Sequence, residues 1–142
     1  MRSQMYCVII FGTLCPILTA FLFDDPCEIS PVGYNENTTI DVFANNSCTT
    51  GSVSWDFPMG NLRIHFLSNN SKPFYVCFSN SLIGSILTFF DASNGIEYRM
   101  GPLGQQDQSE TCTLLHEEEV IVRTSPKHLV YVTRVYYRMK WI

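Results

Sequence analysis

Three histidines, six cysteines and thirteen carboxylates are the groups in this chain that could do chemistry. The most suggestive run is His116-Glu117-Glu118-Glu119-Val120, which begins like the zinc-protease helix motif. That motif needs a second histidine one helical turn later, so that both imidazoles face one metal, and Val120 occupies that position. We therefore interpret the run as an exposed acidic turn before a strand.

The remaining titratable residues give no catalytic pattern either. His65 lies on the polar face of an alternating segment and His128 in a turn, and neither has a serine or cysteine nucleophile at a recognisable spacing. Carboxylates at Asp56, Asp91 and 117–119 could offer oxygen ligands to Ca²⁺. They match no calcium-site pattern, so we interpret them as solvated loop charges. The sequence predicts no enzyme activity, no cofactor and no metal.

The first twenty residues are typical of a secretory signal peptide. One positive charge, Arg2, precedes an apolar run over residues 6–15, a proline then breaks the helix, and small residues close the segment. Ala20 is the residue expected before the cleavage site. Residues 1–20 are therefore the predicted signal peptide and residues 21–142 the predicted mature chain.

An uncleaved membrane anchor is the alternative for this segment. Residues 6–23 just reach the length of a membrane span, but the central proline and the single positive charge favour cleavage. We predict a secreted, extracellular chain with no membrane span after cleavage. Eight basic residues then face thirteen acidic ones, a net charge of −5, which does not favour nucleic acid as a partner.

Four cysteines remain after cleavage: Cys27, Cys48, Cys77 and Cys112. An even number in a secreted chain indicates two disulfides, and the residues alone leave all three pairings open. A zinc site is a weaker interpretation, because none of the four belongs to a C-x-x-C pair.

Three N-glycosylation sequons agree with a secreted chain. Each lies in a polar stretch expected to form a loop. The predicted acceptors are Asn37, Asn45 and Asn69.

The mature region has the short alternating segments and turns of an all-β protein. Leu62, Ile64 and Phe66 alternate with polar residues, and Asn94-Gly95 is typical of a tight hairpin turn. No convincing helix is present. We expect a loop at 101–110, a turn at 125–127, and strands near 61–66, 73–78, 86–90, 96–100, 111–115, 119–124 and 129–141, which together favour an antiparallel sandwich.

The last of these segments is the longest. Tyr131, Val135 and Tyr137 share one face, and the length suits an edge strand that pairs with another chain. Trp141 lies on the same face and suits either an exposed contact or a strand residue that a further domain would cover, whereas Trp55 is expected to lie in the core.

A more specific pattern begins at Cys48. It continues through Gly51, Val53, Trp55, Phe57-Pro58 and Gly60. This pattern resembles the N-terminal CUB-like domain of the meteorin family, secreted neurotrophic and cytokine-like proteins. Cysteines at the family's remaining positions extend the resemblance over residues 27–140.

The resemblance implies a CUB-like β-sandwich over residues 21–142, with sequential disulfides Cys27–Cys48 and Cys77–Cys112. It makes Gly51, Val53, Trp55, Pro58 and Gly60 residues of the fold motif. The family's second, cysteine-rich C-terminal domain has no counterpart in these 142 residues.

The function implied by the resemblance is binding rather than catalysis. We expect a secreted glycoprotein that acts as a meteorin-like signalling, neurotrophic or cytokine-like ligand on an extracellular or cell-surface protein. The alternative is a structural or adhesive extracellular module without a dedicated signalling receptor. Saturable, high-affinity binding to cells would distinguish the first from the second.

Overall fold

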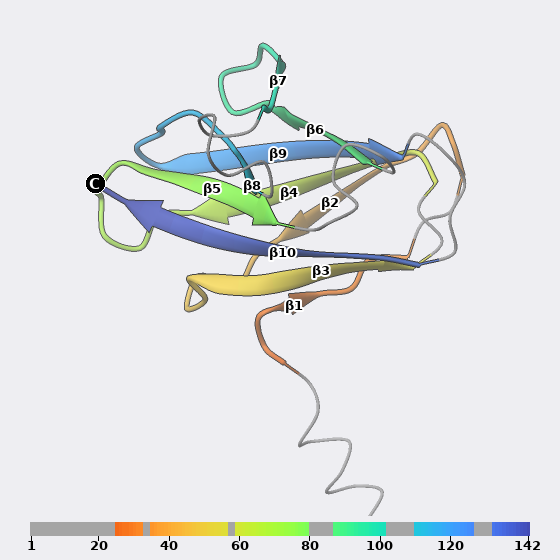
Figure 1. Cartoon of the computed structure of the whole chain (residues 1–142), viewed down its shortest axis with the longest axis horizontal. Coiled ribbons are helices and arrows are strands. Elements are labelled where there is room, and N and C mark those ends of the chain that lie inside the picture. The colour runs from red at the N-terminus through yellow and green to blue at the C-terminus, as the bar shows by residue number, and fades with distance from the viewer. Residues whose placement is uncertain (1–24, 33–34, 57–58, 80–86, 102–109, 127–131) are drawn as a thin grey trace, which may run out of the picture.

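The computed structural model describes residues 25–32, 35–56, 59–79, 87–101, 110–126 and 132–142 (Figure 1). Every regular element in these ranges is a strand, so the predicted all-β class is confirmed. The predicted signal peptide, residues 1–20, lies outside the described residues. The strands are β1 (Glu28–Ile29), β2 (Thr39–Phe43), β3 (Thr50–Asp56), β4 (Asn61–Leu67), β5 (Phe74–Ser79), β6 (Leu87–Asp91), β7 (Tyr98–Arg99), β8 (Glu110–Cys112), β9 (Glu119–Pro126) and β10 (Val132–Trp141).

These described strands form two five-stranded sheets that pack face to face (Figure 1). The first sheet has the order β1-β3-β10-β5-β8 and the second the order β2-β4-β9-β6-β7. Neighbouring strands are antiparallel, except that β1 runs parallel to β3 and β2 runs parallel to β4. The predicted sandwich is confirmed, with one parallel pair in each sheet.

The core lies between the two sheets. Leu62, Ile64 and Phe66 are fully buried on β4, as their alternation predicts, and Val135 and Tyr137 enter the same core from β10. The Phe66 and Tyr137 rings meet edge to face, with centroids 5.1 Å apart. Burial of each large apolar side chain stabilises the fold by about 1.5–3 kcal/mol.

Three expectations about the strands are wrong. The last strand, β10, lies in the middle of its sheet between β3 and β5, so it is not an edge open to another chain. β9 extends to Pro126, where we expected a turn. The hairpin between β6 and β7 has the loop 92–97 instead of a two-residue turn, because Asp91 opposite Tyr98 is its last pair.

The described fold-motif residues have structural roles. Val53 and Trp55 are buried in the core. A Cβ on Gly51 would lie 2.1 Å from the Cys27 carbonyl oxygen, so only glycine lets β1 lie so close to β3. Gly60 has φ +77°, and a Cβ added there would clash with the carbonyl oxygens of Thr38 and Asn35. Pro58 lies outside the described residues.

Both disulfides have the pairing that the meteorin resemblance implies. Cys27 bonds to Cys48, and Cys77 bonds to Cys112. The second disulfide links directly opposed residues of β5 and β8. Two disulfides indicate an oxidising compartment. Among the described residues there is no helix with the length and apolar character needed to cross a membrane.

Candidate functional site

The outer face of the second sheet carries a cluster that we call the Phe43 surface: Asp41 and Phe43 on β2, Arg63 and His65 on β4, and Glu119 on β9. The parallel register of β2 and β4 sets Phe43 beside His65 and Asp41 beside Arg63. The side chains point outward because the intervening residues of these strands supply the core.

Phe43 is the exposed centre of this surface. The residue is 64% exposed, although phenylalanine is normally among the buried residues. The ring stacks on His65, with centroids 4.6 Å apart and an angle of 24° between the planes. The sheet therefore presents a large aromatic ring to solvent and supports it from one side.

His65 is held by a carboxylate on each side. Its Nδ1 lies 2.8 Å from Glu119 Oε1, and its Nε2 lies 3.1 Å from Asp41 Oδ1. Carboxylates only accept hydrogen bonds, so the ring makes both bonds together when both of its nitrogens carry a proton. The imidazole plane under Phe43 is thus fixed from two strands.

Asp41 also forms a bidentate ion pair with Arg63. Arg63 Nε lies 2.8 Å from Oδ1 and Nη2 lies 3.0 Å from Oδ2. Hydrogen bonds from His65 and Arg63 lower the pKa of Asp41, against the opposing effect of desolvation. The carboxylate stays ionised above the acid range and continues to brace the surface.

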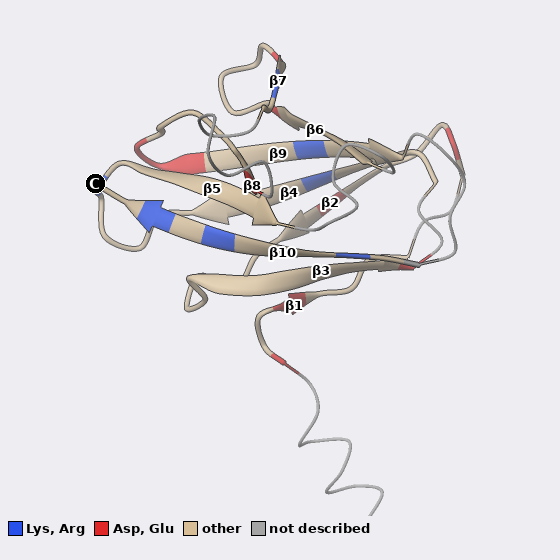
Figure 2. Ribbon diagram, in the orientation of Figure 1, with Lys and Arg blue, Asp and Glu red and all other residues tan. Residues whose placement is uncertain are grey.

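Beside the Phe43 surface, further charged side chains lie on β9 and on the β6–β7 hairpin. Figure 2 shows basic residues on β4 and β9 and acidic residues at the start of β9. Arg123 lies over the Phe90 ring at 4.2 Å and donates hydrogen bonds to Glu97 and Asn61. The Phe43 surface therefore adjoins a second aromatic ring covered by a paired cation.

Glu117 and Glu118 are exposed before β9, as the expected acidic turn requires, but the side chain of His116 is largely buried. Its Nε2 lies 2.8 Å from Asp91 Oδ2, and the two side chains are 8% and 3% exposed. Leu114 N and Ser93 also donate to Asp91. Burial raises the pKa of Asp91, but the hydrogen bonds from His116, Ser93 and Leu114 lower it below 3.8 overall.

This buried cluster does not have the order of a catalytic triad. In a triad the histidine lies between the nucleophile and the carboxylate. Here Asp91 lies between Ser93 and His116, and the Ser93 hydroxyl donates to Asp91 at 2.7 Å. The cluster instead ties the β6–β7 hairpin to the segment between β8 and β9.

The structure separates the carboxylates that we considered for calcium. Asp91 is buried and hydrogen-bonded, so it is not the solvated loop charge that we expected. Glu119 braces His65 on the Phe43 surface, and Glu117 and Glu118 are exposed. His128 lies outside the described residues.

Both tryptophans pack in or against the hydrophobic core. Trp55 is 1% exposed, as expected. Trp141 is partly buried and stacks on Phe74, which argues against the first of its two interpretations, an exposed contact.

The three sequon asparagines are exposed and lie at two ends of the sandwich. Asn37 precedes β2, at the end where β2 and β4 both begin. Asn45 follows β2 and Asn69 follows β4, and Asn69 Nδ2 donates to the Asn46 carbonyl. All three acceptors are thus accessible, and two share one end.

Sequence reasoning missed Asp41 and Phe43. A local signal was available, because in Thr39–Phe43 the apolar Ile40 and Val42 alternate with Thr39, Asp41 and Phe43. That alternation places Phe43 on the polar face, where a large aromatic ring indicates a contact surface.

Comparisons with known proteins give little further information. No protein-family model matches the chain, and no curated protein matches it. Among solved structures, the chain is similar to PliG of Aeromonas hydrophila, a periplasmic inhibitor of g-type lysozyme, with a TM-score of 0.44 and 10% sequence identity. The match covers 78% of this chain and 99% of that chain. So weak a likeness supports no functional inference.

Proposed function

We propose that this chain is a secreted, glycosylated and non-enzymatic binding protein that acts as a meteorin-like ligand on an extracellular protein through the Phe43 surface. The observation that carries the proposal is the 64% exposed Phe43 ring stacked on a doubly braced histidine. The disulfides support an extracellular site of action, and the meteorin pattern supports a signalling role.

The Phe43 surface has the properties of a protein-binding hot spot. Aromatic and arginine side chains dominate the energy of protein interfaces. Phe43 is held by His65, and Arg63 is held by Asp41, so both are already ordered before a partner arrives. Because this order reduces the entropy lost on association, a modest patch can bind tightly.

A cell-binding assay tests the proposal. Labelled wild-type protein, collected from secreting cells, should bind responsive neural or glial cells saturably. Phe43→Ala should weaken that binding about 30-fold or more, corresponding to the roughly 2 kcal/mol of a hot-spot residue. His65→Ala should weaken it less, because it removes the support but leaves the ring.

Ile96→Ala is the matched control. Ile96 is 62% exposed on the same sheet's hairpin, and its truncation should leave binding unchanged. Non-saturable, low-affinity retention of the wild type on matrix would favour the adhesive alternative. Equal binding by the wild type and Phe43→Ala would refute the assignment of this surface.

A further inference from the structure

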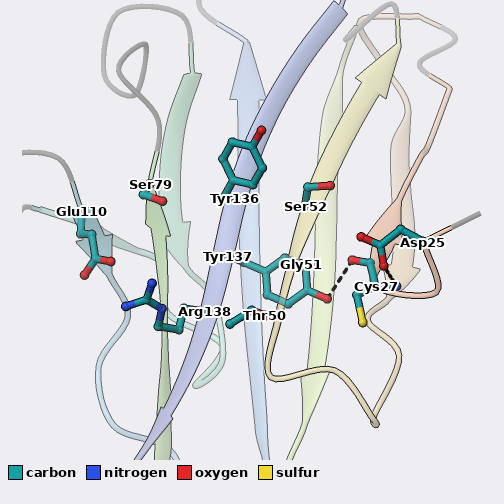
Figure 3. Close-up of a pocket in the computed structure, with 10 residues that line it drawn as sticks. All are labelled: Asp25, Cys27, Thr50, Gly51, Ser52, Ser79, Glu110, Tyr136, Tyr137 and Arg138. Atoms are coloured by element: carbon teal, nitrogen blue, oxygen red, sulfur yellow. Dashed lines mark hydrogen bonds between the residues drawn. The ribbon is translucent and has the colours of Figure 1, made fainter. Parts of the chain in front are cut away.

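The outer face of the first sheet, opposite the Phe43 surface, carries an open groove of about 580 Å³ (Figure 3). Strand register places five groups in one row across this sheet: Glu28, Ser52, Tyr136, Ser79 and Glu110. An aromatic ring thus stands at the centre, with a hydroxyl on each side and a carboxylate at each end. Adjacent strands lie about 4.8 Å apart, so the row is about 19 Å long.

Tyr136 gives the groove its shape. The residue is 56% exposed, and both of its cross-strand neighbours are serines. Figure 3 shows the Tyr136 ring on β10 with Ser52 and Ser79 to either side. Because these neighbours are small, space remains beside the ring for a flat ligand.

Polar groups with unused bonding capacity surround the ring. Arg138 lines the groove and makes no hydrogen bond or ion pair with any described residue. Glu110 uses Oε2 to accept from Lys140, and Asp25 uses Oδ1 to accept from the Cys27 backbone N–H. One available donor and two held carboxylates therefore flank an exposed aromatic ring on the sheet.

We propose that this groove binds a saccharide, with Tyr136 as the stacking platform. A pyranose ring has an apolar C–H face, which packs on the negative face of an aromatic ring. Its hydroxyl edge both donates and accepts, and this matches the Arg138 guanidinium beside the ring and the carboxylates of Glu110 and Asp25 toward the two ends of the groove. The length of the row suits an oligosaccharide.

Other ligand classes fit the groove less well. An anionic ligand or a nucleic acid would be repelled by two carboxylates and attracted by only one arginine. A lipid or an apolar peptide would cover hydroxyls and charged groups without offering them hydrogen bonds. A metal ion would meet Glu110 beside Cys77 and Cys112, whose sulfurs are already joined in a disulfide.

The saccharide has two possible sources. Asn45 Nδ2 donates to the Pro26 carbonyl at 3.3 Å, and Asp25 and Cys27 on either side of Pro26 line the groove. A glycan on Asn45 would therefore start beside one end of the groove. The ligand is either this glycan or one carried by another molecule, and an Asn45→Gln variant separates the two.

The test measures binding of secreted protein to a panel of immobilised oligosaccharides, including N-glycan fragments. We expect at least one oligosaccharide of the panel to bind the wild type, or to bind Asn45→Gln, which lacks the Asn45 glycan. Tyr136→Ala, made in the form that binds, should weaken binding about tenfold, the size of an aromatic contact. Tyr136→Phe should retain binding, because the stacking ring remains.

Tyr98→Ala is the control, since Tyr98 is 49% exposed on the other sheet and should not matter. Binding by Asn45→Gln alone would show that the chain's own glycan occupies the groove of the wild type. Equal binding by both forms would assign the groove to an external glycan. Failure of both forms to bind any oligosaccharide, or undiminished binding by Tyr136→Ala, would overturn the proposal.

Discussion

Replacing Gly51 by alanine should separate β1 from β3. The added Cβ would lie 2.1 Å from the Cys27 carbonyl oxygen and 2.5 Å from the Tyr137 hydroxyl oxygen, whereas real contacts are essentially never shorter than 3.0 Å. Cys27 must therefore move by nearly 1 Å. That carbonyl accepts hydrogen bonds from Ser52 N at 3.2 Å and from the Tyr137 hydroxyl at 3.1 Å, and the shift stretches both beyond bonding distance.

The cost of Gly51→Ala follows from these two bonds. Each lost hydrogen bond costs about 1 kcal/mol, and a buried hydroxyl left without a partner costs about 1–3 kcal/mol. Tyr137 is only 2% exposed, so its hydroxyl has little access to water. We expect a loss of about 3 kcal/mol in the free energy of unfolding. At roughly 3–5 °C for each kcal/mol, Tm falls by about 9–15 °C.

Denaturant unfolding of the oxidised protein measures this loss. Gly101→Ala is the control, because nothing lies within 4 Å of its added Cβ, and it should stay within about 0.5 kcal/mol of the wild type. Tyr137→Phe removes the hydroxyl that Gly51→Ala leaves unpaired, so the two substitutions together should cost at least about 1 kcal/mol less than their sum. A Gly51→Ala protein as stable as the control, or strict additivity, would refute the reasoning.

Three further outcomes are expected. Replacing Cys77 and Cys112 by serine should lower the free energy of unfolding by about 4 kcal/mol, since the bond closes a loop with a sequence separation of 35; thermal unfolding checks this. Asp91→Asn should cost about 2–4 kcal/mol at pH 7. Because the pKa of Asp91 is lowered in the folded state, the wild type should lose this stability as the pH falls below about 4, and the variant should lose less over that range. Asn45→Gln should remove one glycan from the intact mass of the secreted protein.

Short-range patterns predicted the interior of the fold well. The alternation of Leu62, Ile64 and Phe66 fixed the buried face of β4, because side chains of a strand point to opposite faces. The meteorin resemblance implied the disulfide pairing, which spacing left open. β1, β2 and β3 were not among the expected strands. β1 has only two residues and so almost no pattern, and the parallel pairing of β1 with β3 and of β2 with β4 leaves no turn signal between partners.

The candidate sites depend on contacts between distant residues, which a single sequence does not reveal. His65 was placed on the polar face, but its partner Glu119 is 54 residues away. The run that begins at His116 was interpreted as an exposed acidic turn, and nothing in it indicates that Asp91, 25 residues earlier, holds the His116 ring inside. The row through Tyr136 exists only once the register of all five strands is known.

The strand order also determines when folding can finish. β10 is the middle strand of the first sheet and β9 the middle strand of the second, yet they are the latest of the described strands to be synthesised. Until residues 119–141 are available, β3 and β5 lack their shared neighbour, as do β4 and β6. Such long-range pairing slows folding and keeps apolar strands exposed on the nascent chain. All four paired cysteines, Cys27, Cys48, Cys77 and Cys112, are synthesised before residues 119–141 and can be oxidised in that interval. Correct disulfide pairing in the cell should therefore depend on exchange catalysed by a disulfide isomerase.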